Sequence, residues 1–138
     1  MKYILPVPYF VQPTETTCQA TSCKMLAVYY DATKNFLSEE DIKKLINEHP
    51  DRPVKEYENH IDNMVWWLNR DLVGKKIFVR VSLNIEYAIP KIISCLNSRR
   101  PVLLSTNHSR VEGHIIVVVG YQNYHVSIFS PEFKFIIN

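Results

Sequence analysis

The chain has 138 residues, which is the length of one domain and enough to bury a hydrophobic core. Apolar residues make up 46% of it and only three residues are glycine, which indicates a globular protein rather than a disordered one. Its 16 basic and 14 acidic residues leave a net charge of +2, which favours neither a nucleic-acid partner nor an anionic membrane. We therefore predict a single domain over residues 1–138 with no nucleic-acid partner.

The cysteine count and the apolar runs exclude further classes of protein. Three cysteines do not suggest a disulfide framework, and no CxxC or HExxH spacing is present, so we expect neither a metal ion nor a cofactor. The longest apolar run, about six residues, is too short to span a membrane, so we expect no membrane insertion. The N-terminus carries Pro6 and Pro8 and has no long apolar core, unlike a standard signal peptide. The expected location is the cytoplasm, or outside it by a route without a cleavable signal peptide.

The first two thirds of the chain are predicted to be mainly helical. Residues 3–11 are expected to be extended, because their two prolines exclude a helix interior. Thr16 and Thr17 then supply cap chemistry for a helix over residues 18–30, which is apolar enough to be a buried central helix. The next elements expected are a helix over 38–48 capped by Ser38, a helix over 60–72, a strand over 77–81 and a helix over 85–96 bent at Pro90.

The last third of the chain changes character and predicts strands. The run over residues 113–121 is rich in β-branched residues, which favour extended structure. The other elements expected here are strands over 101–105, 125–129 and 133–137, with a tight turn at Asn123-Tyr124. Helices first and an antiparallel sheet second is an α+β layout.

Two segments roughly a hundred residues apart carry the chemistry that the sequence suggests. Gln12-Pro13-Thr14-Glu15-Thr16-Thr17-Cys18 runs into the predicted central helix, and Gly113-His114 opens the predicted β-branched strand. A thiol is a nucleophile only as thiolate, and a free pKa of about 8.5 leaves little thiolate at neutral pH. A helix N-terminus and an imidazolium both lower the pKa of a thiol. Cys18 lies where the first acts and His114 can supply the second, so we interpret them as nucleophile and general base.

Attack on a carbonyl builds negative charge on its oxygen, and this charge needs positioned donors. The backbone N–H of Cys18 is one candidate, and the side-chain amide of Gln12, six residues earlier, is another. The two remaining cysteines, Cys23 and Cys95, are interpreted as small core residues. Four further histidines are interpreted as surface or loop residues: His49, His60, His108 and His125.

These segments also resemble a known family. Val7-Pro8-Tyr9-Phe10-Val11-Gln12, followed by Thr17-Cys18, is similar to the N-terminal motif of the bacteriocin-processing, or double-glycine, peptidases, which are papain-like cysteine peptidases. Residues 113–121 resemble the histidine motif of that family, and residues 100–104 resemble the strand that precedes it. Ser130-Pro131 aligns with the Asp-Pro of the family. The similarity covers nearly the whole chain in the family's order.

The resemblance implies a fold and a set of roles. It implies a helical layer that carries the cysteine, packed on a C-terminal antiparallel sheet that carries the histidine, with the site in the cleft between them. It implies Cys18 as nucleophile, His114 as base and Gln12 as oxyanion donor. Ser130 takes the place of the third residue, an aspartate in the family. A hydroxyl can orient an imidazole as an acceptor, but it cannot stabilise an imidazolium by charge.

A second departure from the family pattern follows the cysteine directly. The family has glycine and then proline there, whereas this chain has Gln19-Ala20. A glutamine side chain at this point would narrow the cleft or change the choice of substrate.

The leading interpretation is a thiol hydrolase that acts on a peptide or amide bond, most simply a cysteine peptidase with a peptide or protein substrate. A glycine-rich cleavage site is implied, because family members often cut after paired glycines. The same residues also serve acyl transfer, deamidation and transglutamination, which differ in what resolves the thioester.

Two alternatives from other classes stay open at the level of sequence. One is a papain-like effector or toxin domain delivered to other cells, for which an inhibitor or immunity protein would be a partner. The other is a degenerate, non-catalytic peptide-binding module. Gln19 and Ser130 argue for that module, whereas the presence of Gln12, Cys18 and His114 argues against it.

Overall fold

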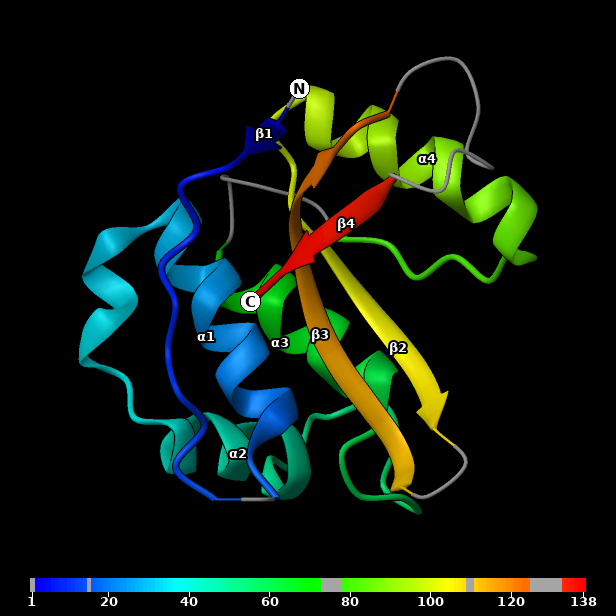
Figure 1. Ribbon diagram of the computed structural model, residues 1–138. Coiled ribbons are helices and arrows are strands. Elements are labelled where there is room, and N and C mark those ends of the chain that lie inside the picture. The colour runs from blue at the N-terminus through cyan, green and yellow to red at the C-terminus, as the bar shows by residue number, and fades with distance from the viewer. Residues whose placement is uncertain (1, 15, 73–77, 109–110, 125–132) are drawn as a thin grey trace.

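The computed structural model describes residues 2–14, 16–72, 78–108, 111–124 and 133–138, and the side chains at positions 106–114 are outside that description. Figure 1 shows helices packed against an antiparallel sheet, which confirms the predicted α+β class. The described helices are α1 (Cys18–Tyr30), the 3-10 helix η1 (Ala32–Phe36), α2 (Glu39–Glu48), α3 (Ile61–Asp71) and α4 (Ile85–Asn97). The described strands are β1 (Lys2–Ile4), β2 (Val102–His108), β3 (Val111–Gln122) and β4 (Lys134–Ile137).

Local cap chemistry explains where two of the helices begin. The Ser38 hydroxyl accepts a hydrogen bond from the backbone N–H of Asp41 at 3.1 Å, and the first turn of α2 carries three acidic residues, which suit the positive end of a helix. The ring nitrogen Nδ1 of His60 likewise accepts from the backbone N–H of Asp62 at 3.1 Å. The third helix therefore begins one residue later than predicted, with His60 as its cap.

The strand β3 is the centre of the sheet. It pairs antiparallel with β1, β2 and β4, and the registers include Lys2 opposite Gln122 and Val102 opposite Val118. The pairing of β1 with β3 brings the N-terminal segment onto the sheet, which the sequence did not predict beyond an extended conformation. Gly120 permits it, because a Cβ atom there would collide with the backbone carbonyl oxygen of Tyr3.

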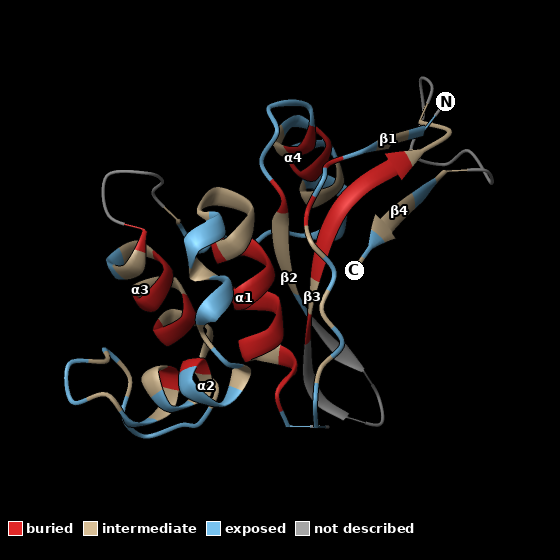
Figure 2. Cartoon of the chain, turned by 90° about the vertical axis from the view of Figure 1, so that its left-hand side faces the viewer, coloured by how far each residue is buried: buried red, intermediate tan, exposed pale blue. Residues whose placement is uncertain are grey.

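The core lies between the helices on one side and the sheet on the other. Figure 2 shows α1 between α3 and the sheet, with buried residues along most of its length. This confirms the prediction of a buried central helix. Each large apolar side chain removed from water in this way contributes about 1.5–3 kcal/mol to folding. The fully buried side chains come from the helices and from β3, and include Leu26, Ile42, Met64, Trp67, Leu68, Leu96, Val117 and Val118.

The strand predicted over residues 77–81 is wrong for the part of it that the structure describes. Residues 78–84 have no regular secondary structure. The side chain of Asn69 accepts from the backbone N–H of Phe78 at 2.6 Å and donates to its carbonyl oxygen at 3.0 Å. A side chain of α3 therefore satisfies this backbone in place of a neighbouring strand. The alternating Val79 and Val81 are exposed, so the period of two here does not mark a buried face.

The other predicted elements that fall on described residues form, apart from their ends, whereas the 3-10 helix η1 was not predicted. The fourth helix forms with Pro90 inside it, and the strands β2 and β3 extend beyond the ranges 101–105 and 113–121. Asn123 has a φ of 57°, as a residue in a tight turn does. The predicted strand over 125–129 lies outside the described residues. None of the helices in the described ranges is both long and apolar enough to cross a membrane.

Candidate active site

Cys18 is the first residue of α1, and the residue is 8% exposed. The loop before it is closed by Thr17, which does not cap the helix as predicted. The Thr17 hydroxyl donates to the carbonyl oxygen of Thr14 at 2.9 Å and accepts from the backbone N–H of Thr14 at 3.1 Å. The Thr17 hydroxyl therefore bonds within the loop and does not accept from a backbone N–H of the first turn of α1. The partial positive charge of the helix N-terminus remains beside Cys18.

The amide of Gln12, predicted to be an oxyanion donor, has a local partner in the loop that precedes α1. Its Nε2 donates to the carbonyl oxygen of Thr14 at 2.8 Å, rather than to Cys18. An amide nitrogen carries two hydrogens, and this bond uses one of them. The bond therefore fixes the direction of the amide without using all of its donor capacity.

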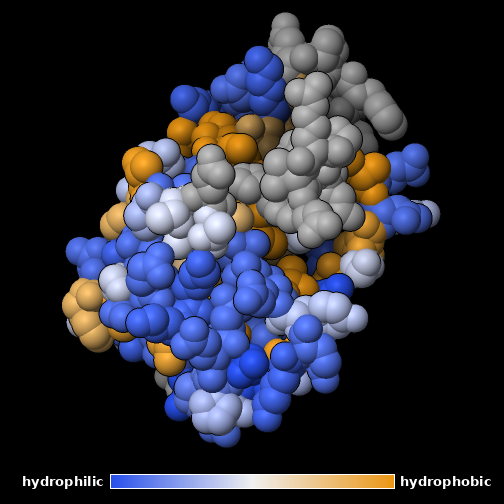
Figure 3. Space-filling model, turned by 90° about the horizontal axis from the view of Figure 1, so that it is seen from below, coloured by the Kyte–Doolittle hydropathy of each residue, from blue (hydrophilic) through white to orange (hydrophobic). Residues whose placement is uncertain are grey.

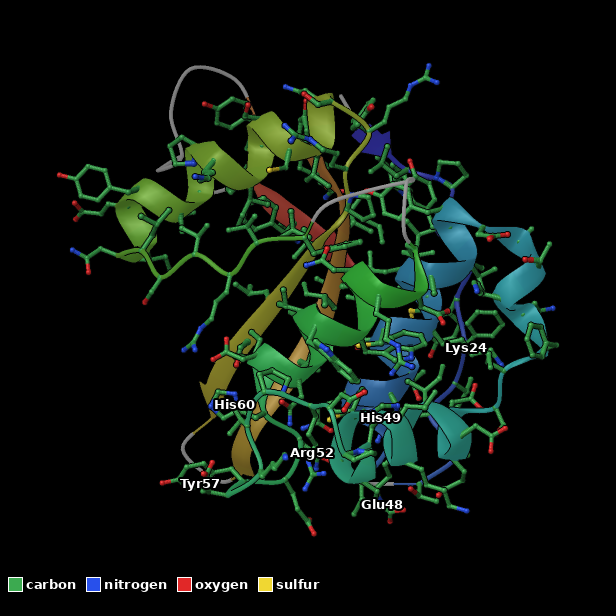
Figure 4. The ribbon with its side chains drawn as sticks, turned by 180° about the vertical axis from the view of Figure 1, so that it is seen from behind. Lys24, Glu48, His49, Arg52, Tyr57 and His60 are labelled. Atoms are coloured by element: carbon green, nitrogen blue, oxygen red, sulfur yellow. The ribbon has the colours of Figure 1, made fainter. Side chains whose placement is uncertain are left out.

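A buried lysine anchors the same loop to the helices. Lys24, on α1, places its Nζ 3.3 Å from Glu39 Oε1 on α2 and 4.8 Å from the centre of the Phe10 ring (Figure 4). An ion pair and a cation–π contact on one ammonium group are both stronger when the group is shielded from water. Phe10 is two residues before Gln12, so Lys24 holds the loop that carries the predicted oxyanion donor.

The strand β3 brings the backbone of His114 to the helix that carries Cys18. His114 pairs with Thr106 of β2, while its side chain lies outside the description. Ser22, one helical turn after Cys18, donates its hydroxyl to the carbonyl oxygen of Ile115 at 3.3 Å. Figure 1 shows α1 and β3 both beginning at the lower end of the molecule, so the start of α1 lies beside the start of β3. Ser130 lies outside the described residues.

Figure 3 shows the molecule from below, looking at the end where α1 and β3 begin. Hydrophilic side chains cover the larger part of this face. Hydrophobic side chains reach the surface along the border with the residues that are not described. This end of the molecule therefore presents both polar and apolar surface.

The side chain of Gln19 contacts the thiol of Cys18 directly. The Sγ atom of Cys18 donates a hydrogen bond to Gln19 Oε1 at 3.1 Å. The sequence singled out Gln19 as the residue in place of a glycine next to the thiol. Its direct bond to the thiol was not predicted, because the rotamer of a side chain at a helix start is not encoded in residue spacing.

The two other cysteines differ from Cys18. Cys23, in the middle of α1, is 0% exposed, and this burial raises the pKa of its thiol far above the ordinary range. The prediction that it is a core residue is confirmed. Cys95, on α4, is partly exposed and lies outside the main core cluster, so the same prediction is wrong for Cys95. The buried residues of α4 are Ile92, Ile93 and Leu96.

Two of the other histidines have described side chains, and both make their contacts with residues other than Cys18. The Nε2 atom of His49 lies 2.7 Å from Arg70 Nη1, and its ring is 5.1 Å from the Trp66 ring. His60 caps α3, as described above. Figure 4 shows both on the side of the molecule where α2 and α3 are joined. The side chains of His108 and His125 lie outside the described residues.

The comparison with family models supports the cysteine peptidase interpretation. The model of the Peptidase_C39-like family matches residues 4–134, which is nearly the whole chain. The chain therefore belongs to this family of papain-like, bacteriocin-processing-type peptidases, and its function is cysteine peptidase-like in general. Neither the comparison with curated proteins nor that with solved structures gave a match. Nothing in the family match favours the effector or toxin alternative.

Proposed function

We propose that the protein is a cysteine peptidase in which Cys18 is the nucleophile and His114 is the general base. The family supports a peptidase in general. The observation that supports this particular pair is the hydrogen bond from Ser22 to the carbonyl oxygen of Ile115. It joins the turn of α1 that follows Cys18 to the residue that follows His114, two positions that are distant in sequence.

The reaction begins with transfer of the Cys18 proton to the imidazole of His114. The thiolate attacks the carbonyl carbon of the substrate, and the carbonyl oxygen becomes an oxyanion. The tetrahedral intermediate then expels the amine, which takes the proton from the imidazolium and leaves a thioester on Cys18. Water, deprotonated by His114, hydrolyses the thioester and restores the thiol.

The oxyanion needs donors, and we assign them to the backbone N–H of Cys18 and the side chain of Gln12. The first is one of the N–H groups that a helix start leaves without a partner inside the helix. The second is a directed amide, because its Nε2 lies 2.8 Å from the carbonyl oxygen of Thr14 and donates one hydrogen to it, while the other hydrogen would serve the substrate. Removing one such donor typically lowers kcat by about a hundredfold or more.

Ser130 takes the orienting role in this proposal. Its hydroxyl would accept a hydrogen bond from the His114 ring and set the tautomer that removes the proton from Cys18. A neutral partner gives the imidazolium no charge stabilisation, so Ser130 orients the base without strengthening it.

The test is hydrolysis of a peptide that contains paired glycines, with a glycine-free peptide of equal length for comparison. Mass spectrometry would locate the cleaved bond. The His114→Ala variant should lose cleavage on the order of 10⁴-fold, as expected when a general base is removed from a nucleophilic pair. Cys95→Ala, which removes a thiol from α4, is the matched control and should cleave normally. Peptide binding without cleavage in the unmodified protein would instead favour the non-catalytic binding module.

A further inference from the structure

We infer that Gln19 controls the reactivity of Cys18 by holding its thiol proton in the resting protein. This inference deepens the proposed function and rests on it, since it assigns to Gln19 the regulation of the same nucleophile. The amide oxygen Oε1 accepts from Sγ at 3.1 Å, which is short for a sulfur donor because sulfur is a large atom. Gln19 is thus a positioning residue that acts through Cys18.

The thiol is the donor in this hydrogen bond and the amide oxygen is the acceptor. An amide oxygen is an acceptor only, so it stabilises the protonated thiol and lies unfavourably close to the negative charge of a thiolate. The thiol must therefore lose this partner, or the amide must turn, before the sulfur can attack. A substrate that enters the site and displaces the Gln19 side chain would release the nucleophile at the moment of binding.

The last torsion of a glutamine side chain is broad and roughly two-fold, so the amide can turn its oxygen away from the sulfur when a substrate enters. In the resting protein the oxygen faces the thiol. The glycine of the family pattern has no side chain and offers the thiol no such acceptor.

Other charged groups surround this end of α1 and have to be separated from Gln19. Lys43 of α2 donates to the Thr16 hydroxyl at 3.0 Å, and the pair formed by Lys24 and Glu39 lies further along α1. His114 belongs to the strand that packs on the same helix. A charge change at Thr16 and a variant without His114 separate these contributions from that of Gln19.

The experiment measures the rate of iodoacetamide alkylation of Cys18 against pH, with mass mapping of the labelled residue. Gln19→Met keeps the side-chain length and removes the acceptor, so alkylation at neutral pH should become about three- to tenfold faster. Gln19→Glu supplies a stronger acceptor that is negatively charged near neutral pH and should slow alkylation by about tenfold or more. The pH at half-maximal rate should move down in the first variant and up in the second.

Thr16→Glu is the matched control, because it adds the same charge at the same helix start beside Lys43 and should move the midpoint less than Gln19→Glu does. Both Gln19 effects should persist in a His114→Ala background. Gln19→Ala replaces Gln19→Met if that variant unfolds, which labelling of the buried Cys23 would reveal. Midpoints equal to that of the unmodified protein in both Gln19 variants would overturn the inference. Alkylation does not require hydrolysis, so a protein that labels as expected but cleaves no peptide would contradict the proposed function alone.

Discussion

The start and the middle of α1 carry the same residue type in two different environments. Cys18, at the start, touches the polar side chain of Gln19 and lies at the end of the helix where the backbone dipoles favour negative charge. Cys23, five residues later, is fully buried, and burial raises the pKa of its thiol. Two cysteines on one helix therefore have different surroundings, and the proposed nucleophile is the one at the helix start.

The start and the middle of α1 are also held in place by different kinds of interaction. The start of α1 is held by short-range bonds within the preceding loop and by the anchor that Lys24 provides. The middle is held by apolar packing against β3 and α3. The polar start of α1 therefore rests on a packed apolar support, which is what the proposed nucleophile would require.

The largest expected effect separates the two cysteines by activity. Cys18→Ala should lower peptide hydrolysis on the order of 10⁴-fold or more, because no other group at the helix start can form the thioester. Cys23→Ala should leave kcat within about threefold and should cost about 1 kcal/mol of folding free energy, a common value for a small change in the core. Peptide cleavage measured beside urea unfolding tests both. A Cys18→Ala protein that cleaves at the normal rate would show that Cys18 is not the nucleophile.

The next effect tests the polar environment at the start of the helix. Gln12→Ala should lower kcat by about a hundredfold or more, the usual loss for one oxyanion donor. Alkylation of Cys18 should be nearly unchanged, since this amide acts on the transition state rather than on the thiol. Steady-state kinetics combined with iodoacetamide labelling give the two readouts. An unchanged kcat would place Gln12 outside the oxyanion site.

A third effect concerns the middle of the helix and depends on pH. The unfolded chain releases the Cys23 proton above its ordinary pKa of 9.0, whereas the folded protein retains it because burial raises that pKa. Folding stability linked to Cys23 is therefore complete below pH 9 and falls as the pH rises, by about 2 kcal/mol at pH 10.5.

Urea unfolding of the unmodified protein and of Cys23→Ala at pH 8 and pH 10.5 measures this loss. The variant should lack the part that is linked to Cys23. Tyr29 and Tyr30, whose pKa values are also raised by burial, contribute equally to both proteins and cancel in the difference. Cys95→Ala is the control and should keep the full loss. Equal slopes in the unmodified protein and in Cys23→Ala would mean that Cys23 is accessible to water.

The smallest effect tests the link between α1 and the histidine strand. Ser22→Ala removes the hydrogen bond to the carbonyl oxygen of Ile115 and should cost about 1 kcal/mol in stability. It should also lower kcat by roughly tenfold, because a small displacement of the nucleophile from its base slows proton transfer. Ser22→Thr keeps a hydroxyl and should recover part of the loss. If stability falls but kcat of the folded protein does not, the hydrogen bond supports the fold without positioning Cys18 relative to His114.

Much of the helical part of the fold could be predicted, because its signals are local. The cap at Ser38 and the apolar run from Cys18 to Tyr30 give their boundaries almost to the residue. The sheet was harder, since pairing depends on distant segments. The join of β1 to β3 at Gly120 and the satisfaction of Phe78 by Asn69 both come from contacts that no short pattern encodes.

The candidate site also has features that the sequence predicts and features that it does not. The position of Cys18 at a helix start and the placement of His114 on the neighbouring strand followed from residue type and order. The local bonds of the site did not. Gln12 turns to Thr14 and Gln19 turns to Cys18 because of side-chain rotamers, which depend on the packed loop rather than on spacing.

Cys18 is proposed to be the nucleophile, and competitive labelling of the three thiols is the sharpest test of this role. Brief iodoacetamide treatment of the folded protein near neutral pH, followed by mass mapping, should label Cys18 first, the partly exposed Cys95 more slowly and the fully buried Cys23 last. The same treatment in urea should label all three and serves as the control. Labelling of Cys23 or Cys95 at a rate equal to or above that of Cys18 in the folded protein would contradict the assignment of Cys18 as the nucleophile.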